Sequence, residues 1–262
     1  EIVATQRTQD LLFRPECVYQ TYKQHIRTYI PLERHVNEGQ SIDVFEKKVI
    51  DGIRGGGAIR GYITAEYGYG KTSTGLYLWD CASSNNILSV PPFQLNKLID
   101  LIIASFGWVR YSIGRKNPDL VNEAESIYES IIKRNAESLS KKYDIQISIA
   151  NRMVKDKPEL LDLTPSEFIE YFEKMTDIAK KAGYDGLLII ADEVQQYIEP
   201  EIKAGTKDPI SPLFDVISAI LTRKKYLNFG LILIIPQKEL ALLKQQRGDF
   251  IHRLLEVSID LS

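Results

Sequence analysis

The sequence has few of the residues that build disulfides, metal sites or membrane spans. Its 262 residues include two cysteines, Cys17 and Cys81, which stand far apart and not in a CxxC spacing. The three histidines form no HxxxH or HExxH pattern, which argues against a zinc site. No apolar run approaches the ~20 residues of a membrane helix, and no signal peptide is recognised at the start. We therefore expect two free thiols, a cytoplasmic location and no membrane partner.

The sequence also lacks an excess of charge of one sign. It has 35 acidic and 33 basic residues, for a formal net charge of −2. This balance argues against a protein whose whole surface is basic, although a local basic groove that binds nucleic acid stays open. The hydrophobic content of 44% is enough for one large core or two modest ones.

Apolar segments that read as strands alternate with helical patterns along most of the chain. The expected strands are 58–64, 85–93, 186–194, 229–236 and 254–261, and the second is expected to stop at Pro91 and Pro92. The expected helices are 41–54, with Ser41 as N-cap and glycines 55–57 at its end, 72–83, 96–113, most of 118–183, 212–225 and 237–246. Continuous apolar strands between helices predict an α/β fold with a parallel sheet covered on both faces.

The pattern divides the chain into two parts. Residues 1–40 have no clean period and read as an N-terminal extension, and residues 41–262 read as one domain with a helical insertion at about 118–183. Within the insertion, Thr164 followed by Pro165 predicts a helix start. The sequence begins with Glu1 and stops just after a strand-like run, so we expect a fragment of a larger protein.

The segment AEYGYGKTS, residues 65–73, lies between an expected strand and an expected helix. Gly68 and Gly70 allow the backbone to curl closely around an anion, and the following helix would direct its positive end at it. Lys71 would contact the outer phosphates of a nucleotide, and Thr72 would offer a hydroxyl to Mg²⁺. The residues expected to bind the triphosphate are Glu66, Tyr67, Gly68, Tyr69, Gly70, Lys71, Thr72 and Ser73.

This segment follows the Walker A pattern G-x4-G-K-[ST], with Ala65 in place of the first glycine. The alternative interpretation is a glycine-rich turn that contains GKT by chance. A second motif, LLIIADEV at 187–194, places Asp192 and Glu193 at the end of an apolar strand. An acid at the carboxyl end of a parallel strand lies at the mouth of the sheet, where ligands bind. We expect the acidic pair to reach the loop from an adjacent strand, with Asp192 holding Mg²⁺ and Glu193 activating water. The alternative is a surface acidic pair.

Other nucleotide-binding classes fit less well. The GTPase motifs DxxG and NKxD and the transporter motif LSGGQ are not found in suitable places, and a small-molecule kinase usually lacks the acidic pair. The 120 positions between Thr72 and Asp192 leave room for an extra strand, as in the additional-strand ATPases and their AAA+ group. The resulting expectation is a three-layer αβα P-loop NTPase core with an AAA+-like parallel sheet and a helical insertion.

The AAA+ interpretation assigns three further catalytic candidates. Gln237, at the tip of the strand 229–236, occupies the sensor position, and Arg247 or Arg253 would reach the γ-phosphate of a neighbouring subunit. The alternatives are a polar residue that only starts a helix for Gln237 and a surface charge for each arginine.

The segments AEYGYGKTS and IIADEVQQY together resemble the ATPase subunits of bacterial BREX-type phage-defence systems, the BrxC and PglY group. They resemble more loosely the origin-recognition and STAND-type AAA+ ATPases. The resemblance covers about residues 41–261, but only the two motifs are specific to it. It implies a large multidomain ATPase that works with other defence components on DNA.

Three hypotheses follow from the sequence. The first is a Mg²⁺-dependent ATPase that acts as a homo-oligomer or in a multi-subunit defence complex, with DNA bound through other domains. The second is an ATP-gated interaction module with little turnover. The third is a nucleic-acid scaffold that uses the basic residues of the helical insertion, against which a solvated helix surface is the plainer interpretation.

Overall fold

The computed structural model describes residues 2–26, 42–115, 117–208, 210–222, 227–254 and 256–261, with the side chains of residues 2–5, 21–26, 250 and 253 not described. Ser41, the predicted N-cap, therefore lies outside the described residues, as does the predicted extension from residue 27 to 40.

Five strands form one sheet in the order β2-β3-β4-β1-β5, and every pairing is parallel. The strands are β1 (Ala58–Ala65), β2 (Ile87–Gln94), β3 (Gly186–Asp192), β4 (Phe229–Pro236) and β5 (Val257–Asp260). All five lie where the sequence predicts strands, and their parallel pairing confirms the predicted α/β class.

Strand β2 differs from its prediction at its carboxyl end. Pro91 and Pro92 were expected to stop the strand, but it continues to Gln94. The register between β2 and β3 shifts between Val90 and Phe93, so the two prolines occupy an irregularity in the pairing. Strand β2 lies at the edge of the sheet and has a neighbouring strand on one side only. Proline, which has no backbone N–H to donate, is tolerated in such an edge strand.

The helices fill the segments between the strands. They are α1 (Ile2–Phe13), α2 (Pro15–Ile26), α3 (Ile42–Arg54), α4 (Lys71–Ser84), α5 (Asp100–Gly114), α6 (Pro118–Tyr143), α7 (Ile147–Asp156), α8 (Pro165–Lys181), α9 (Gln195–Lys203), α10 (Ser211–Thr222), α11 (Gln237–Gln246) and α12 (Gly248–Leu254), with a short 3₁₀ helix at Pro158–Leu160. Helices α1, α2, α9 and α12 have no counterpart among the predicted elements. Among the described helices, none combines the length and apolar content that crossing a bilayer requires.

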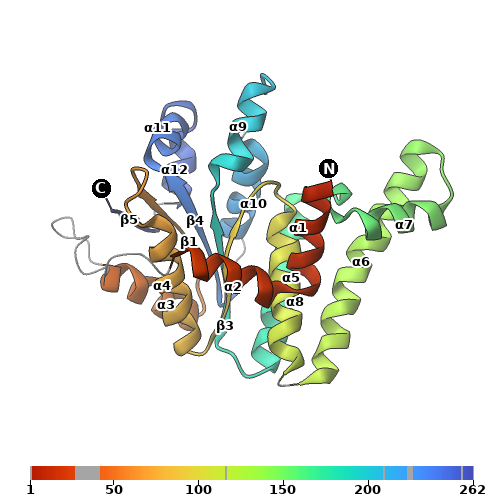
Figure 1. Ribbon diagram of the computed structural model, residues 1–262, viewed down its shortest axis with the longest axis horizontal. Helices are drawn as coiled ribbons and strands as arrows, with labels where there is room; N and C mark the ends of the chain where they lie inside the picture. The colour runs from red at the N-terminus through yellow and green to blue at the C-terminus, as the bar shows by residue number, and fades with distance from the viewer. Residues whose placement is uncertain are drawn as a thin grey trace.

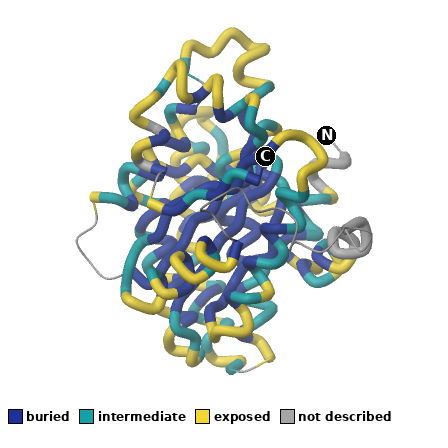
Figure 2. Tube along the Cα trace, turned by 90° about the vertical axis from the view of Figure 1, so that its left-hand side faces the viewer, coloured by how far each residue is buried: buried dark blue, intermediate teal, exposed yellow. Residues whose placement is uncertain are grey.

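The helices cover both faces of the sheet and give the molecule three layers. Helices α3 and α4 pack on one face, and α5, α8, α10 and α12 pack on the other (Figure 1). Alternate residues of each strand point to opposite layers, as in β3, where Ile190 joins the cluster of α3 and α4 and Ile189 joins the larger cluster opposite. All seven residues of β3 are buried, and the buried trace in the middle of Figure 2 follows the sheet.

The segment predicted as an insertion is helical, with its break near residues 156–165 as expected. Helices α6 and α7 project beyond the sheet, whereas α8 returns to pack against β3 and α10 (Figure 1). Thr164 caps α8 in a capping box with Glu167, which confirms the predicted helix start. Cys17 and Cys81 form no disulfide, also as predicted.

The N-terminal helix α1 packs directly on the domain. Leu11 and Leu12 are buried in the larger core cluster beside α5. Arg7 forms an ion pair with the buried carboxylate of Asp100 at 3.3 Å and donates a hydrogen bond to the backbone oxygen of Gln94 at the end of β2. Helix α1 therefore packs against the core, although the first residues of the sequence show no clean hydrophobic period.

Close approach of α1 and α5 requires glycine at position 107. A Cβ on Gly107 would lie 2.0 Å from the backbone oxygen of Leu11, which cannot move without displacing α1. We therefore expect Gly107→Ala to destabilise the protein by about 1–3 kcal/mol, as overpacking does. Thermal unfolding checks this, with Gly114→Ala at the end of the same helix as the control, because a Cβ there meets only Val121 at 3.6 Å. Equal melting temperatures for the two variants would contradict the close packing of α1.

Candidate functional site

The predicted site residues gather where the parallel strands end. The loop 66–70 follows β1, the acidic pair ends β3, and Gln237 follows β4. Ala65 pairs with Pro236, so the start of the loop and the start of α11 lie side by side. The carboxyl edge of a parallel sheet is where α/β proteins bind ligands, and here the positions of the side chains come from the strand register.

The loop needs its two glycines for conformation. Gly68 and Gly70 have φ angles of 87° and 80°, in the left-handed region. A Cβ at either position would meet nothing within 4 Å, so packing does not impose glycine there. Gly70 is the N-cap of α4 and forms no side-chain cap, which leaves the first N–H groups of the 14-residue helix α4 without a side-chain acceptor. The loop therefore presents backbone donors to the edge of the sheet.

Lys71 is folded back over the loop. Its Nζ donates hydrogen bonds to the backbone oxygens of Glu66, at 2.7 Å, and Ala65, at 3.1 Å. Burial lowers the pKa of Lys71, while the nearby carboxylates of Asp192, Glu193 and Glu239 act in the opposite direction. The lysine side chain therefore points into the site, among three carboxylates, and not into the hydrophobic core.

Thr72 and Asp192 meet although they are 120 positions apart. The Thr72 hydroxyl donates a hydrogen bond of 2.7 Å to Asp192 Oδ2. The other oxygen, Oδ1, accepts one of 2.7 Å from the backbone N–H of Glu193, and Asp192 is only 1% exposed. The structure thus brings the two predicted motifs together through the two residues predicted to bind Mg²⁺.

The oxygens of Thr72 and Asp192 fit a magnesium site of the open kind. Mg²⁺ usually takes one or two carboxylates together with waters and substrate phosphates, and it rarely uses a cage made only of protein. The described part of the chain holds no cluster of three or more His, Cys, Asp or Glu side chains able to bind a metal. A hydroxyl and a carboxylate 2.7 Å apart supply the hard oxygen ligands that this ion prefers.

Glu193 has a constrained backbone. Its φ is 54°, in the left-handed region that non-glycine residues rarely adopt. The conformation is fixed by the bond from its own N–H to Asp192 and by the 3.3 Å bond from Val194 N–H to the Ile234 oxygen of β4. Burial, with a further contribution from the charge of Asp192, raises the pKa of the Glu193 carboxyl. Its carboxylate accepts a hydrogen bond from Gln195 Nε2.

Of the three other residues predicted as catalytic, the structure describes the side chains of Gln237 and Arg247. Gln237 lies at the tip of β4, as predicted, and its amide is 3.4 Å from Asp260 Oδ2 on β5. Arg247 pairs with Asp208 at 2.5 Å and Asp249 at 3.2 Å and lies over the Phe214 ring. Arg253 belongs to α12, and its side chain lies outside the described residues.

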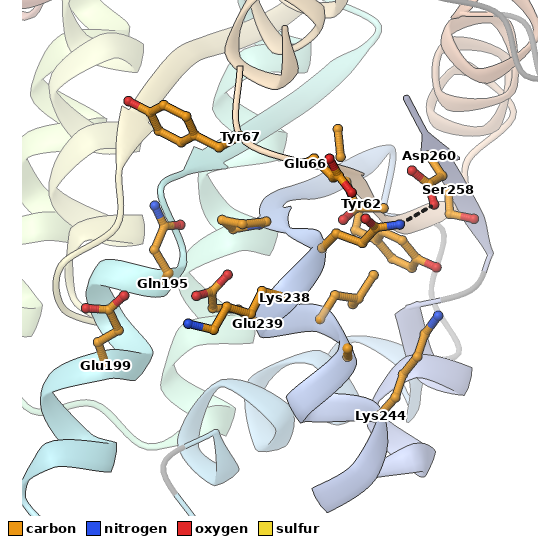
Figure 3. Close-up of a pocket in the computed structure, with 16 residues that line it drawn as sticks. Tyr62, Glu66, Tyr67, Gln195, Glu199, Lys238, Glu239, Lys244, Ser258 and Asp260 are labelled. Carbon is orange, nitrogen blue, oxygen red and sulfur yellow. Dashed lines mark hydrogen bonds between the residues drawn. The ribbon is translucent and has the colours of Figure 1, made fainter. Parts of the chain in front are cut away.

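The other loop residues face outward to different degrees. Tyr67 is 99% exposed and Tyr69 is 41% exposed, while Ser73 is half-buried in the first turn of α4. The Tyr69 N–H is 3.5 Å from the Glu66 oxygen, which closes the turn. Tyr67 directs its ring away from the core (Figure 3).

A cavity of about 960 Å³ opens beside the loop, between β1, β4, β5, α9 and α11. It is lined by Glu66 and Tyr67 of the loop and by side chains that the sequence analysis did not single out: Gln195, Glu199, Glu239, Ser258 and Asp260 (Figure 3). Lys71, Thr72 and Asp192 are not part of its wall, so the cavity adjoins the loop and does not coincide with the centre. Of these five side chains, only Gln195 could have been linked to the site from the sequence, because it lies two positions after Glu193.

The strand order corrects one expectation about this site. The acidic pair was expected to reach the loop from a strand adjacent to β1, but β4 lies between β1 and β3. The strand expected as the extra one, β2, precedes β3 in the sequence but lies at the edge of the sheet. The hydrogen bond between Thr72 and Asp192 therefore spans the end of β4.

Comparison with protein-family models and with curated proteins returned no match to this sequence. The site is therefore interpreted from its own geometry.

The raised pKa of Glu193 predicts a pH-dependent effect of Glu193→Gln on stability. A carboxyl whose folded pKa lies above its ordinary value of 4.5 contributes stability below that value and loses it as the pH rises through the folded pKa. Glutamine does not titrate, so the variant should gain melting temperature relative to the wild type as the pH rises above 4.5. Glu137→Gln on the exposed side of α6 is the control for the loss of one carboxylate outside the site. A Glu193→Gln difference that stays flat with pH, or that reverses, would contradict the raised pKa.

Proposed function

We propose that this chain is an ATPase domain that binds and hydrolyses Mg²⁺·ATP, with an AAA+-like P-loop core. The observation that carries the proposal is the 2.7 Å hydrogen bond between Thr72 and Asp192. It joins the loop of the first motif to the acid of the second motif. Two unrelated surface features, a glycine-rich turn and an acidic strand end, would have no reason to meet in this way.

The phosphates would bind along the loop 66–70 and at the start of α4. The supporting observations are the left-handed Gly68 and Gly70 and the uncapped N–H groups of α4, which favour an anion. Lys71 would exchange the backbone oxygens of Ala65 and Glu66 for phosphate oxygens, which are stronger partners for an ammonium group.

Thr72 and Asp192 would hold Mg²⁺. The positive charge of Mg²⁺ would draw electron density from the phosphate oxygens. It would also offset the repulsion between the phosphates and the carboxylates around Lys71. That repulsion is considerable, because Asp192, Glu193 and Glu239 surround a single lysine. We therefore expect nucleotide binding to depend strongly on magnesium.

Glu193 would take the proton of the attacking water. The water oxygen forms a bond to the γ-phosphorus as the bond from that phosphorus to the β–γ bridging oxygen breaks. The products are ADP, inorganic phosphate and a proton, which Glu193 accepts and later releases. A carboxyl whose pKa is raised by burial is a better proton acceptor than an exposed one. The remaining catalysis comes from positioning and from charge stabilisation.

The second candidate is an ATP-gated interaction module with little turnover. It is favoured by the internal engagement of Lys71, which is bonded to the backbone oxygens of Ala65 and Glu66. Hydrolysis would require the lysine contacts to be exchanged for contacts with phosphate, and a module that lacks this exchange would bind nucleotide without consuming it.

We propose further that the domain works in an oligomer or a larger assembly, of the phage-defence or DNA-associated kind that the sequence resemblance implies, and that hydrolysis drives a change of shape there. An arginine from a neighbouring subunit would then complete the site. Arg247 would first have to leave Asp208 and Asp249, whereas the side chain of Arg253 lies outside the described residues.

ATP binding is tested by thermal unfolding with and without Mg²⁺·ATP. A ligand at about 100 times its Kd stabilises a protein by roughly 2.7 kcal/mol, which corresponds to a rise of roughly 5–10 °C in melting temperature for a domain of this size. We expect Lys71→Ala to abolish the rise and Lys141→Ala, an exposed lysine on α6, to retain it. An unchanged rise in Lys71→Ala would place the nucleotide elsewhere.

Hydrolysis is tested separately with Glu193→Gln. We expect this variant to keep the thermal shift with Mg²⁺·ATP and to lose turnover by roughly 10²–10⁴-fold, the usual contribution of a general base. Phosphate release is measured over a series of protein concentrations, because an arginine supplied by a second copy would make the specific activity rise with concentration. If the wild type binds ATP and is as inert as Glu193→Gln at every concentration, the interaction module is the better description.

A further inference from the structure

Gln195 is the described residue whose side chain contacts the Glu193 carboxylate most directly. It is the first residue of α9, and its Nε2 donates a hydrogen bond to Glu193 Oε2. It also lines the cavity beside the loop, together with Glu66 and Tyr67 (Figure 3). Gln195 therefore stands between the acidic pair and the open side of the site.

The other end of the Gln195 amide is buried without a hydrogen-bond partner among the described residues. This atom, Oε1, is an acceptor, and an acceptor buried without a donor is unfavourable and rare in folded proteins. Turning the amide over would not relieve it, because Oε1 would then face the carboxylate of Glu193, which is also an acceptor. The bond to Glu193 thus sets the orientation of the amide and leaves Oε1 without a hydrogen-bond donor among the described residues.

The same bond removes the remaining freedom of Glu193. Its backbone is already fixed by a φ of 54° and by the 2.7 Å bond to Asp192 Oδ1. The side-chain torsions are the only part of Glu193 that the backbone contacts do not restrain. Gln195 restrains them by holding one carboxylate oxygen, which leaves the other oxygen to accept further hydrogen bonds.

We propose that Gln195 is a positioning residue that holds the Glu193 carboxylate in the orientation from which it takes the proton of the attacking water. This inference rests on the proposed ATPase function. Gln195 does not itself accept the proton: one oxygen of Glu193 stays bonded to the amide, and the other takes the proton as the water oxygen bonds to the γ-phosphorus and ADP leaves.

Gln195→Met tests this role, because methionine retains the length and volume of the side chain and removes both the amide donor Nε2 and the amide acceptor Oε1. Gln196→Met is the matched control, since Gln196 is the exposed neighbour on the same turn of α9. We expect Gln195→Met to lower kcat by about 10- to 100-fold, which is part of the whole contribution of a general base. Affinity for Mg²⁺·ATP should stay within about twofold, and the melting temperature without nucleotide should not fall, because the variant no longer buries an unpaired acceptor. Gln196→Met should leave all three quantities unchanged.

The double variant Glu193→Gln, Gln195→Met separates positioning from a structural role. If Gln195 acts through Glu193, adding Gln195→Met to Glu193→Gln should lower kcat no further. The inference is overturned by an unchanged or higher kcat in Gln195→Met, by a parallel loss of ATP affinity, or by an additive effect in the double variant. A wild type that shows no ATP-dependent thermal shift, or binds ATP without hydrolysing it, overturns the proposed ATPase function and this inference with it, and that result is visible before any Gln195 variant is made.

Discussion

The hydrogen bond from the Thr72 hydroxyl to Asp192 joins the two parts of the chain that carry the candidate chemistry. Asp192 is almost fully buried, so its charge would be unfavourable without the donors that surround it. One donor comes from the first turn of α4 and the other from the N–H of Glu193. The left-handed conformation of Glu193 supplies the second donor, so the strained backbone and the buried acid depend on each other. The contact links the first turn of α4 to the acidic pair, and the strand order and register bring the two together.

The sequence predicts this centre well because its determinants are local. A glycine-rich loop between a strand and a helix needs only the neighbouring residues to adopt its conformation, and Gly68 and Gly70 have positive φ angles that glycine adopts readily. The acids at the end of an apolar strand likewise follow from a single segment. The capping box of Thr164 and Glu167 is another local signal, and it is confirmed. The α/β class follows from the alternation of apolar strands and helices, each of which is readable without its neighbours.

Features that depend on strand order and register could not be predicted in this way. The placement of β4 between β1 and β3 is a choice among several parallel arrangements, and the local pattern of each strand is compatible with all of them. Glu239 comes close to Lys71 because Pro236 pairs with Ala65, and nothing near Glu239 in the sequence indicates that pairing. The continuation of β2 past Pro91 depends on its place at the edge of the sheet. The burial of Leu11 likewise depends on a distant partner, the glycine at position 107 of α5.

The intervening strand β4 sets the width of the site. Neighbouring strands lie ~4.8 Å apart, so β1 and β3, which flank β4, are separated by roughly twice that spacing, ~9.6 Å. If β1 and β3 were adjacent, their end residues would lie in van der Waals contact, and no other group could lie between them. A separation of two spacings leaves room at the strand ends for the first turn of α4, from which Thr72 reaches Asp192. The end of β4 lies between the two outer strands, and α11 begins directly after it at Gln237.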